Sequence, residues 1–320
     1  MPKVDALCIS KEMGQRKRAV DSAIFRSDHG IEGDAHAGPW HRQISLLSAD
    51  DIETARSSGL AEVGPGDFAE NVIVSGMDLA LLGLGSRLRL GPDVVLTVTQ
   101  IGKVCHTPCR IAKLTGDCIM PRLGLFTRVQ KPGEVKVGDK VEIVETVRRD
   151  VFQAVVLTIS DRSSQGQRQD TAGPAVVNRL RDTLKAHIYR TEIVPDEKAT
   201  IADRLKHYSD GHSIDLVVTV GGTGFSPRDV TPEASRDVLE RFTPGLDEAM
   251  RAASLPKTAH AMLSRGTSGI RGSTLIVNLP GSERAAAENL ETILPALGHG
   301  LLKLRGDTTD CSPPPTSDEG

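Results

Sequence analysis

The chain has 320 residues, a formal net charge of −3 and a hydrophobic content of 38%, with charges of both signs interspersed. This length is enough for two domains, and the charge balance gives no basic footprint for nucleic acid or for a membrane surface. No apolar run is long enough to span a membrane, and the first ten residues lack the basic-then-apolar order of a secretory signal, so we expect a cytoplasmic protein.

Short apolar runs separated by Gly- and Pro-containing turns dominate residues 1–146. One helical stretch interrupts them near residues 49–58. The predicted strands cover residues 4–10, 42–48, 71–76, 86–91, 93–102 and 136–145. This pattern predicts a strand-rich, mostly antiparallel domain, with a β-barrel as the expected arrangement.

Residues 152–307 alternate between strand and helix patterns. The predicted strands cover residues 152–160, 189–195, 215–220 and 273–280. The predicted helices cover residues 173–187, 197–209, 231–243, 245–254 and 283–304. Repeated strand-then-helix units predict a mostly parallel sheet with helices on both faces, a three-layer α/β/α domain.

The chain ends in a polar, Pro-rich segment, and its five cysteines are unevenly distributed. We expect residues 308–320 to be a disordered tail, which makes Cys311 a weak functional candidate. Cys105, Cys109 and Cys118 cluster in the first half. In a reducing compartment, such a cluster favours reactive or metal-binding thiols over disulfides.

Polar and glycine residues follow each of four predicted strands in the second half. They are Ser160-Asp161, Pro195-Asp196-Glu197, Gly221-Gly222-Thr223-Gly224 and Pro280-Gly281-Ser282. Ligands of open α/β sheets bind beyond the carboxyl ends of the strands. Glycines let backbone N–H groups approach phosphate oxygens closely, and Asp229, five residues after the glycine loop, is placed to hold a divalent cation on them. The alternative for Asp161 and Ser282 is a helix or turn cap, and for Asp196 a turn residue.

Four long motifs of the second half, LTISDRSSQG, GGTGFSPRDVTPEA, TPGLDEAMR and AMLSRGTSGIRGSTLIVNLPGS, resemble the MogA/MoaB family and the G domains of gephyrin-type proteins. The resemblance covers nearly all of residues 152–307. It implies a molybdopterin-binding α/β/α fold, adenylylation of molybdopterin by ATP with Mg²⁺, a homotrimer, and a partner protein that inserts molybdenum.

The resemblance also implies the site residues. The catalytic acidic positions of the family fall on Asp196 and Asp229, which we expect to hold Mg²⁺ against the ATP phosphates. The glycine loop would line the nucleotide or pterin phosphate with backbone donors. The other expected contacts of pterin and phosphate are Ser160, Asp161, Thr231, Glu233, Ser264, Arg265, Arg271, Gly272, Ser273, Pro280, Gly281 and Ser282. For Arg271 the alternative is a surface arginine in a Gly-rich loop.

In the first half, HGIEGDAHAGPWHRQISLLS, FAENVIVSG, LTVTQIGKVCHTPC and GEVKVGDKVEI resemble the MOSC domain over roughly residues 3–146. Members of that family bind molybdenum cofactor or are proposed to handle its sulfur through one cysteine, which here is Cys105. A thiolate carries sulfane sulfur or binds a soft metal such as molybdenum. Arg42 and Asn71 are the expected contacts of the pterin phosphate.

Two alternatives stay open for this half. Cys105, His106, Cys109 and Cys118 supply enough soft ligands for a zinc site, although their spacing is unusual for one, and Cys118 alone could be a buried small hydrophobe. His29, His36 and His41 lie near Glu32 and Asp34, where structural or polar-pocket roles are favoured over metal binding.

Taken together, the two halves predict a protein of molybdenum cofactor biosynthesis with small pterin and nucleotide substrates. The second half would be the adenylyltransferase, and the first would bind, deliver or sulfurate the cofactor. One alternative is a carrier or scaffold that binds molybdopterin without turning over ATP. Another is a sulfurtransferase or reductase centred on the first half.

Overall fold

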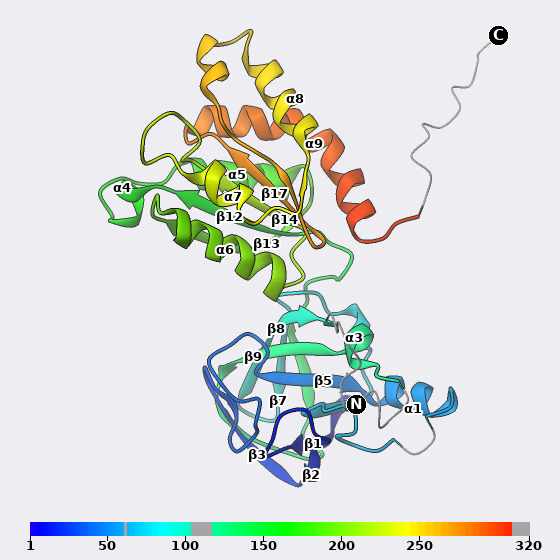
Figure 1. Cartoon of the computed structure of the whole chain (residues 1–320). Coiled ribbons are helices and arrows are strands. Elements are labelled where there is room, and N and C mark those ends of the chain that lie inside the picture. The colour runs from blue at the N-terminus through cyan, green and yellow to red at the C-terminus, as the bar shows by residue number, and fades with distance from the viewer. Residues whose placement is uncertain (61–62, 104–116, 309–320) are drawn as a thin grey trace, which may run out of the picture. The chain divides into compact units, whose positions relative to one another are not determined.

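The computed structural model describes residues 1–60, 63–103 and 117–308. The chain divides into two compact units (Figure 1). The first consists of Met1–Gln153 with the short segment Asp210–Ser213, and the second of Ala154–Ser209 with Ile214–Gly320.

The first unit is rich in strands. Its described helical segments are α1 (Ala49–Ser57), η1 (Leu79–Leu81) and α3 (Met120–Leu123). Its described strands are β1 (Lys3–Ile9), β2 (Arg18–Val20), β3 (Ser22–Arg26), β4 (Gly30–Ile31), β5 (Ile44–Ser48), β6 (Val72–Ser75), β7 (Arg87–Leu90), β8 (Val94–Ile101), β9 (Leu125–Lys131), β10 (Gly133–Lys136) and β11 (Val141–Glu145).

These strands form two sheets. The larger has eight strands in the order β11-β7-β8-β9-β5-β6-β1-β2, and the smaller has the order β10-β3-β4. All the pairings are antiparallel except that of β5 with β6, as the short turns between apolar runs predicted. The expected barrel closure is not found: the described strands follow a linear order, and an isolated bridge between Lys3 and Lys140 brings β1 near the start of β11.

The second unit contains a six-stranded sheet in the order β13-β12-β14-β17-β16-β15. Its strands are β12 (Gln153–Ile159), β13 (His187–Val194), β14 (Leu216–Val220), β15 (Arg241–Phe242), β16 (Gly269–Arg271) and β17 (Thr274–Leu279). β12, β14 and β17 pair in parallel, and β16 and β15 extend the sheet antiparallel. All the residues of β12, β14 and β17 are buried, which explains their continuous apolar sequences.

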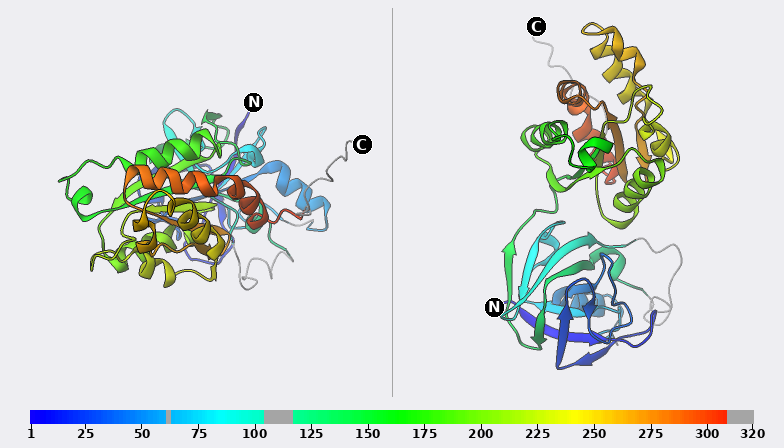
Figure 2. Two further views of the ribbon diagram at one scale, coloured as in Figure 1. Left: turned by 90° about the horizontal axis from the view of Figure 1, so that it is seen from above. Right: turned by 90° about the vertical axis from the view of Figure 1, so that its left-hand side faces the viewer.

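Helices cover both faces of this sheet. They are α4 (Asp161–Ser164), α5 (Ala172–Asp182), α6 (Lys198–Gly211), α7 (Thr231–Arg236), α8 (Pro244–Ser254), η2 (Ala259–Leu263) and α9 (Glu283–Leu304). α5 and α9 pack side by side on one face, whereas α6 and α7 lie on the other (Figure 2). The mostly parallel sheet and its covering helices agree with the fold class expected for this half.

The structure corrects one predicted helix. The pattern over residues 231–243 predicted a single helix, but α7 ends at Arg236 and the chain then forms β15. Arg241 and Phe242 pair with Ile270 and Gly269 of β16, so sheet hydrogen bonds replace helical ones there. This local override is common where tertiary pairing competes with weak helix propensity.

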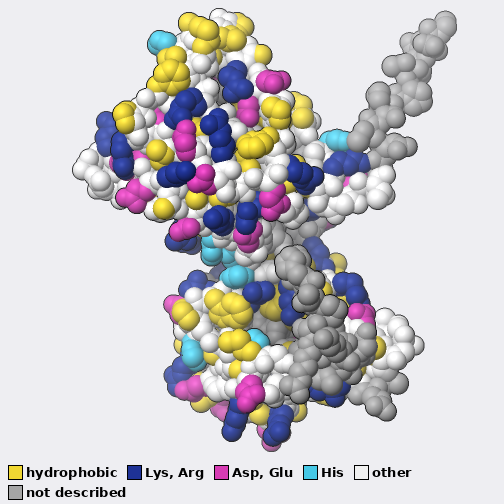
Figure 3. All heavy atoms as spheres, viewed as in Figure 1, with side chains coloured by type: hydrophobic (Ala, Val, Ile, Leu, Met, Phe, Trp, Pro, Cys, Tyr) yellow, Lys and Arg dark blue, Asp and Glu magenta, His cyan; other side chains and the backbone are white. Residues whose placement is uncertain are grey.

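Two features concern the surface of the second unit and the hydropathy of the helices. On the face of the second unit visible in Figure 3, acidic and basic side chains alternate, with hydrophobic ones scattered between them. Of the helices in the described residues, not one has the length and hydropathy required to cross a membrane.

Candidate active site

The carboxyl ends of the parallel strands meet at one edge of the second sheet. Thr158 is paired with Val220, and Val220 with Leu279, so the three strands end together. β13 ends alongside them, because the N–H of Ser160 donates to the carbonyl oxygen of Val194 at 2.9 Å. The four strand-end sequences therefore converge, as the parallel arrangement predicted.

A first cavity of about 320 Å³ opens at this edge. Its polar lining includes Ser160, Asp161, Arg162, Arg168, Asp170, Asp196, Gly221, Gly222, Ser226, Arg228, Asp229 and Gly281. Asp196 and Asp229, which lie far apart in the sequence, thus face the same space. The cavity holds charged groups of both signs.

Asp161 and Asp196 are tied by a reciprocal pair of hydrogen bonds. The N–H of Asp161 donates to Asp196 Oδ2 at 2.8 Å, and the N–H of Asp196 donates to Asp161 Oδ1 at 2.9 Å. Burial raises the pKa of Asp196; the hydrogen bond from the backbone of Asp161 opposes this, and the charges of Asp161 and Asp229 add to the rise. The charge of Arg228 acts in the opposite direction, and a further cation beside Asp196 would stabilise its ionised form.

Asp161 has a cationic partner of its own. Arg228 donates from Nε to Asp161 Oδ2 at 2.9 Å and from Nη2 to Oδ1 at 2.8 Å. These hydrogen bonds hold the pKa of Asp161 below its usual value. Asp161 also begins α4, where the Ser160 side chain accepts from the N–H of Ser163. The predicted capping role thus belongs to Ser160, and Asp161 is an ion-pair partner at the cavity.

The glycine loop leaves no room for side chains at two positions. Gly221 and Gly222 have φ of 114° and 63°, which favour glycine. A Cβ on Gly221 would meet the carbonyl oxygen of Ile159 at 2.4 Å. A Cβ on Gly222 would lie 2.3 Å from Thr231 Oγ1 and 3.1 Å from Asp196 Oδ1. The backbone therefore lines the cavity where the sequence predicted phosphate contacts.

Thr231 holds the glycine loop in place through two hydrogen bonds. It is fully buried, its hydroxyl donates to the carbonyl oxygen of Gly221 at 2.9 Å, and its N–H donates to that of Gly222 at 3.1 Å. Both donors of Thr231 are thus used within the protein, and its expected contact with a ligand remains a prediction. The geometry supports a positioning role for Thr231.

A second cavity of about 640 Å³ adjoins the first. Its lining includes Gly222, Thr223, Gly224, Phe225, Asp229, Arg251, Lys257, His260, Leu263, Ser264, Pro280, Gly281, Ser282 and Asn289. Ser282 is the N-cap of α9, and its hydroxyl accepts from the N–H of Ala285 at 3.2 Å. Helix N-termini and cations favour anionic ligands.

Gly222, Asp229 and Gly281 line both cavities. Two ligands, one in each cavity, would therefore approach each other at Asp229. Such a wall suits a transfer reaction between two bound molecules, because it holds both reactants close and oriented.

The guanidinium of Arg265 donates its hydrogen bonds to other groups of the protein. Its Nε donates to the carbonyl oxygen of Gly224 at 2.7 Å, and its other nitrogens donate to the carbonyl oxygen of Asp229 and to Glu233. The sequence predicted that Arg265 and Glu233 contact the ligand. The two residues lie outside the linings of the first two cavities, but with Asp229 they line a third cavity on the other side of the loop, so their expected ligand contacts remain a prediction.

Arg271, Gly272 and Ser273 form the turn between β16 and β17, also outside both linings. Arg271 donates to the carbonyl oxygen of Val238 at 3.0 Å, and the N–H of Gly272 donates to Glu240 at 2.9 Å. Gly272 has a φ of 56°. Within one copy of the chain this turn is separate from the candidate site, so the expected pterin contacts of these three residues remain a prediction.

Other residues of the site were absent from the predicted set. Asp170 accepts from Thr158 Oγ1 at 2.6 Å and from the N–H of Gly173 at 3.0 Å, which fixes the start of α5 beside the first cavity. Its signal in the sequence was an acidic residue just before an amphipathic pattern. Arg251 lies on α8, and Lys257 follows just after it. Neither was predicted as a site residue, because cations on or near a helix are usually solvated.

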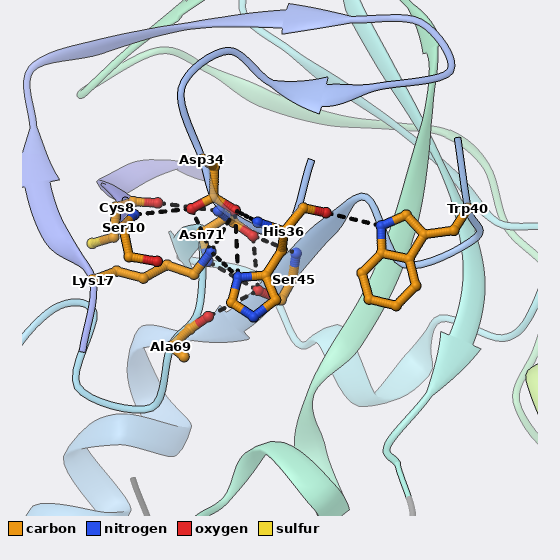
Figure 4. A network of polar contacts seen from close by, with 9 residues as sticks. All are labelled: Cys8, Ser10, Lys17, Asp34, His36, Trp40, Ser45, Ala69 and Asn71. Atoms are coloured by element: carbon orange, nitrogen blue, oxygen red, sulfur yellow. Dashed lines mark hydrogen bonds and ion pairs between the residues drawn. The ribbon is translucent and has the colours of Figure 1, made fainter. Parts of the chain in front are cut away.

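In the first unit, Asn71 is only 2% exposed, and its side chain joins neighbouring strands. Its Oδ1 accepts from the N–H of Ser45 at 3.1 Å, and its Nδ2 donates to the carbonyl oxygen of Cys8 at 3.2 Å (Figure 4). One N–H of Nδ2 is used in this bond and an amide has two, so the expected contact of Asn71 with the pterin phosphate remains a prediction. Arg42 is half-buried, with its guanidinium carbon 4.9 Å from the centroid of the Trp40 ring.

Two histidines of this unit, His36 and His41, lie beside polar partners within the protein. His36 lies beside the buried Lys17–Asp34 pair, and His41 Nε2 is 2.9 Å from Gln100 Oε1. Among the described residues, no group of three or more His, Cys, Asp or Glu is arranged to hold a metal ion. Cys105, His106 and Cys109 lie outside the described residues, and Cys118 is buried.

Comparisons with known proteins agree with this division of the chain. Residues 155–299 match the family described as a probable molybdopterin binding domain, and residues 33–142 match the MOSC domain. A molybdopterin adenylyltransferase from Helicobacter pylori is 43% identical over 153 residues, which are 48% of this chain and 87% of that protein.

Two further relatives match the same half. The molybdenum cofactor synthesis protein cinnamon of Drosophila melanogaster is 43% identical, over 48% of this chain and 26% of its own length, so this chain spans about a quarter of it. The crystal structure of the molybdopterin biosynthesis enzyme MoaB from Thermus thermophilus has 46% identity and a TM-score of 0.47, and the match covers 49% of this chain and 98% of that one. The chain therefore belongs to the molybdopterin adenylyltransferase family through its second half, and it carries a MOSC domain in its first half.

Proposed function

We propose that the second unit transfers the adenylyl group of ATP to molybdopterin, in the biosynthesis of molybdenum cofactor. The first cavity would hold the nucleotide phosphates and the second the pterin substrate. The observation that carries this assignment is the wall of Gly222, Asp229 and Gly281 that the two cavities share.

The reaction has a simple balance. An oxygen of the terminal phosphate of the pterin attacks the α-phosphorus of ATP, a new P–O bond forms, and the bond to the β-phosphate breaks, which releases pyrophosphate. A phosphate monoester is largely ionised near pH 7, so the nucleophile needs no general base. The residues of the chain would act by orienting the phosphates and neutralising their charge.

The acidic residues of the first cavity fit a magnesium ion. Asp196 and Asp229 supply carboxylate oxygens to one space, and magnesium binds through one or two carboxylates together with substrate phosphates and water. A bound Mg²⁺ would neutralise phosphate charge. Asp196 and Asp229 would hold it, and the backbone of Gly221 and Gly222 would orient the phosphates.

The first unit would bind, deliver or sulfurate the cofactor, as expected of a MOSC domain, with Cys105 as the thiol. A Cys105→Ser variant of the full chain tests this role. If the first unit acts on sulfur, this variant loses sulfur transfer but keeps pyrophosphate release; unchanged sulfur transfer would remove Cys105 from the proposal. A homotrimer is expected from the family, and light scattering of the purified chain measures it.

Pyrophosphate release from the full chain with ATP, Mg²⁺ and molybdopterin tests the adenylyl transfer. Asp196→Asn and Asp229→Asn should each keep pterin binding and lower turnover at least a hundredfold, about 2.7 kcal/mol in activation free energy. Arg179→Ala removes an exposed ion pair between Arg179 on α5 and Glu291 on α9; it serves as the matched control and should keep the wild-type rate. Tight pterin binding by the wild-type chain without pyrophosphate release would favour the carrier instead.

A further inference from the structure

Arg228 stands out among the cations of the first cavity, because a carboxylate fixes its guanidinium in two places. Asp161 accepts from its Nε and its Nη2 at 2.9 Å and 2.8 Å, in the parallel fork geometry that suits arginine. The side chain of Arg228 is nevertheless 58% exposed. An arginine has five N–H donors, and Asp161 engages two of them.

Asp161 is itself held firmly. Its backbone N–H and one of its carboxylate oxygens take part in the reciprocal hydrogen bonds with Asp196, and it is the first residue of α4. The guanidinium of Arg228 is therefore anchored through Asp161 to the same backbone that positions Asp196. This anchor reduces the conformational entropy that a long side chain loses when it binds a ligand.

The charge of the cavity also favours a cation near the proposed nucleotide, and three arginines, Arg162, Arg168 and Arg228, line it. Asp161, Asp196 and Asp229 face a space in which the proposed nucleotide would add further negative charge. Magnesium offsets only part of the charge of a triphosphate. Arg228 directly precedes Asp229 on the same loop, so one loop presents a cation and a proposed magnesium ligand side by side.

We propose that Arg228 binds the triphosphate of the nucleotide in the first cavity, and that Asp161 is the positioning residue that orients its guanidinium. The inference rests on the proposed function for the identity of the nucleotide. It assigns a specific ligand to Arg228, and it gives Asp161 the role of a support where the sequence predicted a ligand contact.

The test measures ATP binding with Mg²⁺ and without pterin, by calorimetry on the full chain. We expect Arg228→Ala to weaken ATP binding about 10- to 100-fold, as the loss of charge-assisted hydrogen bonds predicts. Arg228→Lys keeps the charge but loses the fork, and should recover part of this loss. Arg179→Ala should bind ATP as the wild type does.

Asp161→Asn keeps the oxygen that accepts from the N–H of Asp196, so the backbone link to Asp196 survives. If Asp161 acts through Arg228, Asp161→Asn weakens ATP binding in the wild type but adds nothing to Arg228→Ala. In steady-state assays of both single variants, KM for ATP should rise while kcat changes by only a few-fold.

Three outcomes would overturn the inference: wild-type ATP affinity in Arg228→Ala, tighter binding in Asp161→Asn, or effects of the two substitutions that multiply. Its failure is distinguishable from that of the proposed function. A wild-type chain that binds ATP through Arg228 but releases no pyrophosphate with molybdopterin would refute adenylyl transfer and leave the role of Arg228 intact.

Discussion

The side chain of Arg265 holds the main chain of Asp229 in place. The guanidinium donates to the carbonyl oxygen of Asp229 and, at 2.7 Å from Nε, to that of Gly224, so it closes the loop between these two residues. Glu233 on α7 completes the set of partners. A single planar cation thus determines where a proposed magnesium ligand lies.

This arrangement predicts that Arg265→Lys lowers kcat about 10- to 100-fold, because an ammonium group cannot span both carbonyl oxygens and small displacements of reacting groups are costly. Pterin affinity should change little. Pyrophosphate release and equilibrium pterin binding separate the two effects. A large loss of pterin affinity with kcat unchanged would instead support the phosphate contact that the sequence predicted for Arg265.

Gly222→Ala should also disturb the candidate active site, through the glycine loop. The new Cβ would press on Thr231 Oγ1 and approach Asp196, and φ of 63° disfavours alanine. We expect a loss of about 1–3 kcal/mol in the free energy of unfolding and a lower rate of pyrophosphate release. Gly245→Ala in α8 is the matched control, since a Cβ there meets nothing within 4 Å. Equal effects of the two substitutions would contradict the steric argument.

Breaking the buried ion pair of the first unit should lower the free energy of unfolding strongly. Lys17 Nζ donates to both oxygens of Asp34, at 2.7 Å and 2.8 Å, and both side chains are 1% exposed (Figure 4). Lys17→Met leaves a buried carboxylate without its cation and should cost about 3–5 kcal/mol in the free energy of unfolding. The double variant with Asp34→Asn should recover part of this loss.

Urea unfolding followed by Trp40 fluorescence measures this change. Trp40 is the only tryptophan of the chain, and its Nε1 donates to the carbonyl oxygen of His36 at 2.9 Å, next to the ion pair. Lys3→Met, which removes an exposed pair with Asp5 at 3.8 Å, is the control and should change stability by less than about 1 kcal/mol. A cost as small as this for Lys17→Met would show that the buried pair contributes little.

The buried carboxyl group of Glu70 should make the free energy of unfolding depend on pH. It is fully buried, and burial raises its pKa to about 7 although the N–H groups of Gly66 and Phe68 donate to it. An unfolded glutamate titrates near pH ~4.3, so between these two values the folded chain holds the extra proton. The contribution of Glu70 to the free energy of unfolding therefore falls as pH rises through this window and is level above it.

The total fall is about 3–4 kcal/mol, from 1.36 kcal/mol for each unit by which the two pKa values differ. Urea unfolding at pH 4.5 to 8 should show a smaller fall for Glu70→Gln, which cannot ionise, than for the wild type. Parallel curves for the two proteins would mean that Glu70 keeps the same pKa in both states.

The sequence predicted the second unit well because buried parallel strands and amphipathic helices have strong, long patterns. It also placed Asp196 and Asp229 correctly at one edge, since strand ends of a parallel sheet must converge. The short strands β2, β3 and β4 were missed, because two to five residues carry too little periodicity, and the seven-residue strand β9 was missed as well. β15 was read as helix for the same reason.

The sequence pattern could not predict in which direction each side chain points. Arg265, Arg271 and Arg228 all occur near glycine-rich motifs, but only Arg228 lines the first cavity. Carbonyl oxygens of distant residues attract the other two guanidinium groups, and no sequence spacing reveals that. Similarly, no sequence spacing reveals that the amide of Asn71 joins strands, and its expected contact with a ligand remains a prediction.

The wall of Gly222, Asp229 and Gly281 has a thermodynamic consequence for the proposed reaction. A ligand in one cavity changes the electrostatic potential and the mobility of a wall that the other ligand also contacts. Linkage then requires reciprocity: if ATP with Mg²⁺ alters the affinity for the pterin by some factor, the pterin must alter the affinity for ATP with Mg²⁺ by the same factor.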